Sequence, residues 1–271
     1  MARFSKLTTV LICVAFTVFA PTLVEAGEPT AGPQEYTAVY QVLRKNKNLA
    51  EVTVRLSRQD NTWTLHGFTH DMQGLAKALN VKGVQTVSGR WQDGRFLPEN
   101  YDFAFSLIGY KTSWHADFDW PSGIVTTRSK SGKTQLSLEN GAVDPFSLSL
   151  NISSYLGDDQ SQMEVEVIDE DQIENHLYIA DLEESVQTAL GCMKTTRVKR
   201  VRENSKRTSL AWYANDFNYV PVQMQHFKKE GKGLKLQIIS LDIAGQSVLP
   251  LGPCENDEAG FRNTELAQPP R

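Results

Sequence analysis

Apolar and polar residues alternate in short runs along most of the chain. In residues 36–42 every second side chain is apolar, and residues 52–56 and 63–67 repeat the pattern. A period of two is typical of a strand that buries one of its faces. Turn residues such as those at 58–61 separate the runs. The pattern therefore predicts strands joined by short turns in a large antiparallel sheet.

The same reasoning predicts strands in both halves of the chain. Residues 91–96 form a predicted hairpin around Asp93-Gly94, and Pro98 is expected to end it. A second hairpin is predicted to turn at Ile108-Gly109. Later strands are predicted at residues 123–129, 134–138, 163–168, 176–180, 192–202, 206–213, 220–228 and 234–241.

Two stretches interrupt the alternation and favour short helices. Residues 71–80 predict one helix with Asp71 as its N-cap, although Gly74 weakens it. In residues 144–155, Asp144 is a suitable N-cap and Pro145 suits the first turn. The expected fold is therefore all-β with one or two short helices, as a large curved antiparallel sheet of half-barrel or barrel-like form.

Two aromatic stripes lie on the strands beside the Ile108-Gly109 turn. One interpretation is an ordinary core, since large apolar side chains fill most cores. The alternative is the wall of a ligand cavity, because a sheet with few helices must close on itself, dimerise or hold an apolar ligand. The candidate ligand-binding residues are Tyr101, Phe103 and Phe105 on one strand and Trp114, Phe118 and Trp120 on the next.

The first 26 residues have the pattern of a secretory signal peptide. A short positive start precedes an apolar run over residues 7–20, and Val24-Glu25-Ala26 suits signal-peptidase cleavage. The run is shorter than the roughly 20 residues of a membrane span, and no second long apolar run follows. We therefore expect a periplasmic protein without a transmembrane segment after cleavage. The expected divisions are a signal peptide (1–26), a flexible leader (27–35), one β-rich domain (36–254) and a disordered polar tail (255–271).

Cysteine usage fits an exported protein. Cys13 lies in the apolar run, so only Cys192 and Cys254 follow the predicted cleavage site. In an oxidising compartment two cysteines favour one disulfide bond. A catalytic thiol is the alternative, but no His-rich motif accompanies either cysteine.

Charge is unevenly distributed along the chain. The net charge of -4 argues against general nucleic-acid binding. Residues 158–184 hold eleven acidic side chains and no Lys or Arg, whereas residues 194–207 hold seven Lys or Arg and one acid, Glu203. Neighbouring strands that pair these charges would explain the pattern. The alternative is a docking surface for an envelope protein or for lipid phosphates.

Catalytic motifs are scarce in the sequence. Ser131-Gly132-Lys133-Thr134 imitates only the end of a phosphate-binding loop, and the patterns G-x-S-x-G and H-E-x-x-H do not occur. His66 and His70 would share a strand face but lie about 13 Å apart. The sequence therefore predicts no metal ligand, no cofactor and no catalytic residue, and it leaves enzymatic activity undecided with a preference for a non-catalytic role.

Several short motifs in fixed order resemble a known family. They are the strand at Tyr36–Tyr40, Asp144-Pro145-Phe146-Ser147-Leu148, Leu190-Gly191 leading into Thr195-Thr196-Arg197-Val198, Trp212 with Asp216, and Pro221-Val222. Over residues 36–241 the chain resembles the exported bacterial proteins of domain of unknown function 3108. The family has no assigned reaction, so the resemblance implies no catalytic residue. It implies an exported β-sheet protein of Gram-negative type, similar in fold to the periplasmic lipoprotein-carrier half-barrels that hold acyl chains.

Three functions remain open from the sequence. The first is a binding or carrier protein for an apolar or lipid-like ligand. The second is an interaction or scaffold protein of envelope assembly that uses the charged strands. The third is a hydrolase of glycan or lipid, with Asp117, Asp119 or Asp216 as candidate carboxylates.

Overall fold

The computed structural model describes residues 34–139, 141–203, 205–228 and 232–255. The predicted signal peptide, most of the predicted leader and residues 256–271 lie outside these ranges. Strands dominate the described chain, and two short helices interrupt them, α1 (Gly74–Ala78) and α2 (Leu148–Gly157).

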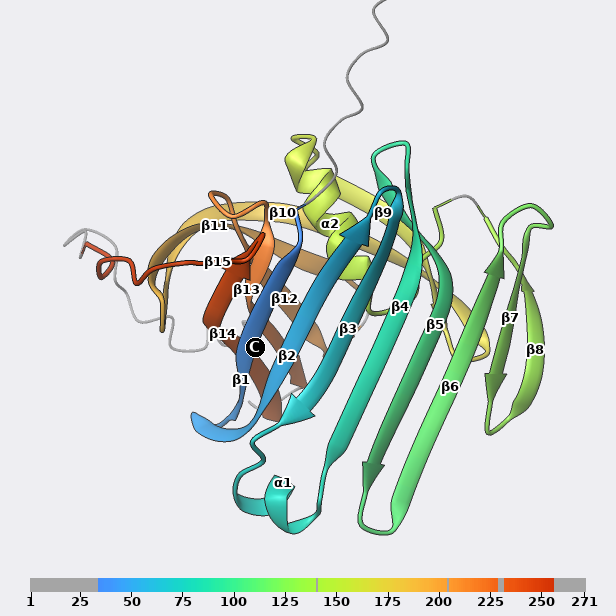
Figure 1. Cartoon of the computed structure of the whole chain (residues 1–271), viewed down its shortest axis with the longest axis horizontal. Coiled ribbons are helices and arrows are strands. Elements are labelled where there is room, and N and C mark those ends of the chain that lie inside the picture. Colours follow the sequence, from blue (N-terminus) through green and yellow to red (C-terminus); the bar gives the residue numbers. More distant parts are fainter. Residues whose placement is uncertain (1–33, 140, 204, 229–231, 256–271) are drawn as a thin grey trace, which may run out of the picture. The chain divides into compact units, whose positions relative to one another are not determined.

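One antiparallel sheet contains every strand named here (Figure 1). Its first half comprises β1 (Tyr36–Arg44), β2 (Lys47–Gln59), β3 (Thr62–His70), β4 (Lys82–Gln92), β5 (Arg95–Leu107), β6 (Tyr110–Asp119), β7 (Ile124–Ser129) and β8 (Gly132–Ser137). Its second half comprises β9 (Gln162–Asp169), β10 (Gln172–Thr188), β11 (Gly191–Val201), β12 (Thr208–Ala214), β13 (Val220–Lys228), β14 (Lys232–Ile243) and β15 (Gln246–Ser247).

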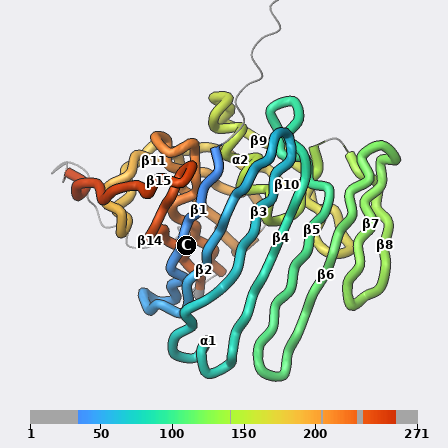
Figure 2. Tube along the Cα trace, in the orientation of Figure 1, coloured from blue at the N-terminus to red at the C-terminus, as the bar shows by residue number. Residues whose placement is uncertain are grey.

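The two halves are meanders that join through β1 and β14. The strand order runs β8-β7-β6-β5-β4-β3-β2-β1-β14-β13-β12-β11-β10-β9, with β15 beside β14. Figure 2 shows the blue strand β1 next to the red strand β14, although they lie far apart in the sequence. The path begins at β8 and ends at β9, so the sheet is curved but not closed. The predicted all-β class and antiparallel sheet are confirmed.

Helix α2 lies inside the curve and touches both halves of the sheet. The side-chain amide of Asn151 accepts a hydrogen bond from the Phe96 N–H (3.2 Å) and donates one to the Phe96 carbonyl (3.0 Å) on β5. On the other side, the Ser153 hydroxyl donates to the Tyr219 carbonyl (2.8 Å), just before β13. The helix therefore ties the first meander to the second.

The start of α2 differs in detail from the prediction. The helix is present, but it begins at Leu148 and Ser147 precedes it. The buried carboxylate of Asp144 instead accepts the backbone N–H groups of Phe146 (2.8 Å) and Ser147 (2.9 Å). Asp144 therefore caps the turn that leads into the helix.

The predicted cap of α1 is wrong. The helix is shorter than residues 71–80, and Gln73 precedes it without a side-chain capping bond. Asp71 instead lies 2.7 Å from Nδ1 of His70. The carboxylate is thus engaged by the imidazole rather than by the helix, which begins three residues later at Gly74.

The expectation that Pro98 ends a strand is also wrong. Pro98 lies inside β5, opposite Gly89, where the register between β4 and β5 shifts. A Cβ at Gly89 would meet the Leu97 carbonyl oxygen at 2.0 Å, so glycine is required there. A bulge tolerates a residue without an N–H group. The Pro98 carbonyl accepts a hydrogen bond from Nε1 of Trp120 (2.7 Å), which also secures the bulge.

The predicted disulfide bond is confirmed. Cys192 and Cys254 are bonded, with their Cα atoms 4.7 Å apart. The bond holds the C-terminal segment against the β10–β11 turn, where the Leu251 N–H donates to the Leu190 carbonyl (2.6 Å). Gly191 has φ +106, and a Cβ there would meet the Leu251 carbonyl oxygen at 2.3 Å. Only glycine allows the two segments to lie this close.

The acidic and basic stretches pair across neighbouring strands. Arg197 on β11 donates to Asp181 on β10 (2.8 and 3.1 Å). Arg200 on β11 donates to Glu174 on β10 (3.0 Å). Cross-strand pairing therefore accounts for part of the charge pattern.

Candidate functional site

An apolar groove of about 460 Å³ lies between α2 and the concave face of β10–β14. We call it the α2 groove. Leu148 and Ile152 of α2 form one wall. The floor is a row of four residues on adjacent strands: Val198, Ala211, Met224 and Leu236.

Strand register builds this floor. Val198 pairs with Ala211, Ala211 with Met224, and Met224 with Leu236, so four side chains stand in one line on the same face. Ala211 on β12 is the smallest of these side chains, which leaves room above β12. Leu234, also in the groove, is 44% exposed. The groove thus presents apolar surface to solvent.

One end of the groove is basic. Arg200, Ser209 and His226 line it, and they come from β11, β12 and β13. Nη2 of Arg202 donates to the Ser209 hydroxyl (3.1 Å), and that hydroxyl lies 2.9 Å from Nδ1 of His226. We call Arg200, Arg202, Ser209 and His226 the basic end.

Burial and like charges shape the basic end. Burial lowers the pKa of Arg202, and the neighbouring guanidinium groups of Arg200 and Arg207 lower it further. Burial also lowers the pKa of His226 below its ordinary value, and four cations add to this: Arg202, Arg207, Lys228 and Arg200. In contrast, burial raises the pKa of Tyr178, which lines the groove, to about 12, so its hydroxyl stays neutral.

A second pocket, of about 540 Å³, is polar and lies where α2 meets β9 and β10. Burial lowers the pKa of His176 in its wall, and both ring nitrogens are engaged, with Glu174 (2.8 Å) and the Tyr178 hydroxyl (3.0 Å). Burial raises the pKa of Glu166, and Glu139 raises it further. Both ring nitrogens of His176 are already engaged by neighbours, so neither is free to take a proton from a ligand, and this pocket offers less than the groove.

The predicted aromatic residues of β5 and β6 lie on the concave face of these strands. Trp120 directly follows the last residue of β6. Tyr101 and Trp114 are buried with their ring centroids 4.6 Å apart. Phe118 is buried and stacks with the half-buried Trp120 at 6.2 Å. Phe103 is also half-buried against this core, and Phe105 lies 6.4 Å from the Tyr110 ring. Tyr101, Trp114 and Phe118 belong to the main core, with Phe103 and Trp120 packed against it. Phe105 lies outside that cluster, and none of the six lines the α2 groove. Their role in ligand binding stays a prediction.

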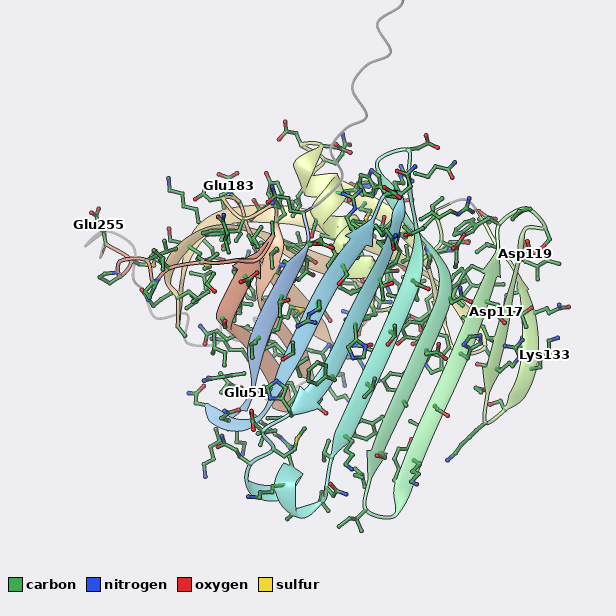
Figure 3. The ribbon with its side chains drawn as sticks, viewed as in Figure 1. Glu51, Asp117, Asp119, Lys133, Glu183 and Glu255 are labelled. Carbon is green, nitrogen blue, oxygen red and sulfur yellow. A yellow bond between two sulfur atoms is a disulfide. The ribbon has the colours of Figure 1, made fainter. Side chains whose placement is uncertain are left out.

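The candidate catalytic carboxylates have separate surroundings. Asp117 bonds Nε2 of His115 (2.7 Å) and Nη1 of Arg128 (2.7 Å). Asp119 accepts the Ser122 N–H (3.3 Å) at the β6–β7 turn. Asp216 is exposed between β12 and β13. Figure 3 marks Asp117 and Asp119 near the β7–β8 hairpin.

One group of metal-ligand types occurs in the described chain. Donor atoms of Glu51, His70 and Asp71 lie within 4.8 Å of one another, and Figure 3 marks Glu51 near α1. His70 already bonds Thr53 through Nε2 (2.8 Å) and Asp71 through Nδ1 (2.7 Å). Both ring nitrogens of His70 are therefore already engaged.

The α2 groove could not be recognised in the sequence. Its lining residues were assigned to strands and to a helix, but their apolar character did not differ from that of an ordinary core. The relevant signal is the alignment of residues about 12 positions apart across β11–β14, which requires the register.

None of the helices in the described ranges is long and apolar enough to cross a membrane.

Comparison with known proteins gives the family. The sequence matches a family described as "Protein of unknown function (DUF3108)" over residues 35–238. The match spans most of the chain, which therefore belongs to this family, as the sequence motifs indicated. No curated protein matches the sequence.

Comparison with solved structures supports the fold. A β-barrel-like protein of domain of unknown function DUF1849 from Brucella abortus has 12% sequence identity and a TM-score of 0.53, covering 78% of this chain and 98% of that one. At this identity the likeness concerns the fold alone. A protein from Parabacteroides distasonis, provisionally classed as a lipoprotein, has 10% identity and a TM-score of 0.27, over 78% of this chain and 97% of its own. A TM-score this low supports no conclusion about the fold of this chain.

Proposed function

We propose that this member of the DUF3108 family is a periplasmic binding protein that carries an apolar, acyl-like ligand in the α2 groove. The observation that carries the proposal is the row Val198, Ala211, Met224 and Leu236, which faces a hollow of about 460 Å³. Small-molecule sites occupy about 300–1,000 Å³ and are mostly apolar. Burying one methylene contributes about 0.8 kcal/mol, so a short alkyl chain has enough apolar surface to bind.

Two features support an exported location. The N-terminal sequence has the pattern of a signal peptide. The Cys192–Cys254 disulfide is of a kind that persists in oxidising compartments. The scaffold alternative receives less support, because Arg197 of the basic stretch is paired with Asp181 and Glu184 of β10.

A matched pair of leucines tests the groove. Leu234 lies in it and is 44% exposed, while Leu182 on β10 is 43% exposed and lies outside it. Binding of the uncharged probe N-phenyl-1-naphthylamine is followed by fluorescence. Leu234→Glu is expected to weaken binding about tenfold, because the ligand then meets a charge in place of about 2 kcal/mol of apolar contact. Leu182→Glu should bind like the wild type.

Filling the groove gives a second test. Ala211→Trp places an indole on the floor and should exclude the probe, whereas Ala78→Trp at an exposed position of α1 should not. Melting temperatures control for folding. The proposal is overturned if the wild type binds no probe, or if Ala211→Trp folds and binds normally. Loss of binding in Phe103→Ala with normal binding in Ala211→Trp would move the site to the aromatic stripes.

A further inference from the structure

The basic end joins the apolar floor directly. Arg200 follows Val198 by two residues on β11, so both side chains stand on the concave face. Ser209 pairs with His226 across β12 and β13, two residues beyond the Ala211–Met224 pair and on the same face. A ligand chain lying along the floor would therefore place one of its ends against these residues.

The basic end contains donors without acceptors. Nη2 of Arg200 is bonded to Glu174, but Nε of the same guanidinium is buried without a hydrogen-bond partner among the described residues. Nη2 of Arg202 is bonded to Ser209, but its Nη1 is likewise buried and unpartnered within the described chain. Buried donors that lack an acceptor are costly, and those of a charged group more so.

Positive charge exceeds negative charge here. Glu174 is the carboxylate that pairs with Arg200, and it is shared with His176 (2.8 Å). Every charged side chain that shifts the pKa of His226 is a cation. An anion at this point would satisfy the free donors and reduce the repulsion among the cations.

Resting on the proposed function, we infer that the ligand is an amphiphile whose anionic headgroup, a carboxylate or a phosphate monoester, binds at the basic end while its alkyl chain lies in the α2 groove. Arg200, Ser209 and His226 line the groove and supply the polar contact, while Arg202, bonded to Ser209, adds its positive charge beside them. Charge complementarity thus selects among apolar ligands, which the floor alone would not do.

Competition for the bound probe separates headgroup from chain. Dodecanoate and methyl dodecanoate have the same alkyl chain, and both are used below the concentration at which dodecanoate forms micelles. Dodecanoate is expected to displace N-phenyl-1-naphthylamine at about tenfold lower concentration, since one charge-assisted contact is worth about that factor. Displacement by both compounds at equal concentration would overturn the headgroup inference and leave the carrier proposal intact. Displacement by neither would overturn both.

A charge-matched pair of variants tests the assignment to residues. Arg202→Gln should bring the preference for dodecanoate down to about twofold or less, while methyl dodecanoate binds as before. Lys199→Gln removes one positive charge from an exposed position on the same strand and should keep the full preference. If both variants lose the preference for dodecanoate equally, the preference reflects positive charge in general rather than this residue, and the assignment to the basic end is overturned.

The last experiment compares dodecanoate with inorganic phosphate and acetate. If either one at millimolar concentration raises the melting temperature of the wild type as much as dodecanoate does, the basic end binds free anions and the amphiphile inference fails. Dodecanoate alone is expected to raise it.

Discussion

His115 on β6 links the carboxylates of two strands on the convex face of the sheet. Nδ1 lies 2.8 Å from Asp102 and Nε2 lies 2.7 Å from Asp117, and Arg128 bonds the second oxygen of Asp117. Partial burial disfavours the charged imidazolium, but the hydrogen bonds to both carboxylates outweigh it and raise the pKa of His115 above its ordinary value. The folded state therefore favours the protonated form of His115, and protonation of the ring adds to stability.

The pH dependence of stability follows from the direction of that shift. The contribution is fully present below about pH 6.5, the unfolded-state pKa, and is lost as the pH rises through the higher folded-state pKa. Because the site is partly exposed, we expect less than about 1 kcal/mol. Urea unfolding of wild type and His115→Gln should differ more at pH 5.5 than at pH 8.5. An equal or larger difference at pH 8.5 would contradict the assignment.

Helix α2 is the element that makes the groove possible. It connects β5 to the segment before β13 through Asn151 and Ser153, and its apolar side forms one wall. Asn151 is buried and pairs with both the N–H and the carbonyl of Phe96. The helix therefore owes its position to polar contacts as well as to packing.

Removing the Asn151 amide should release this connection. Asn151→Ala leaves two buried backbone groups of Phe96 without this partner, and we expect a loss of about 2–3 kcal/mol in the free energy of unfolding. Ser154→Ala is the control, because its hydroxyl bonds only the Leu150 carbonyl of the same helix (3.2 Å) and should cost less than about 1 kcal/mol. The two losses are measured by urea unfolding. Equal losses would count against the bridging role of Asn151.

At the scale of the whole molecule, an open sheet has two edges to protect. On the β9 edge, Val143 donates its N–H to the Glu166 carbonyl (2.9 Å) and accepts from the Ile168 N–H (2.8 Å). This short parallel bridge covers part of the edge. The other edge, β8, is only 6 residues long. Short and covered edges limit pairing with other chains.

The disulfide closes the segment from β11 to the end of the described chain into a loop. Cys192 and Cys254 are 62 residues apart, and constraining a loop of that length stabilises a fold by about 4 kcal/mol in the chain-entropy model. The double variant Cys192→Ala, Cys254→Ala should lose about 2–4 kcal/mol in urea unfolding. Reductant should destabilise the wild type by a similar amount and leave the variant unchanged. A reductant effect of the same size in the variant would show that the bond is not its cause.

The strands, the hairpin at Ile108-Gly109, the family and the disulfide could be predicted from the sequence. Period-two alternation depends on neighbours along one strand, and turn residues act over two positions, so both are local properties. The disulfide followed because only Cys192 and Cys254 come after the apolar N-terminal run. The place of Pro98 was mispredicted because the bulge opposite Gly89 depends on a second strand.

The α2 groove depends on tertiary structure. Val198, Ala211, Met224 and Leu236 form one row only because hydrogen bonding fixes the register of four strands. Whether that row becomes core or groove depends on how closely α2 covers it. The aromatic residues of β5 and β6 carried the stronger sequence signal for a cavity, yet three of them are buried. Sequence periodicity determines which face of a strand is apolar; the distance to the opposing layer determines whether that face is filled by the protein or left open to a ligand.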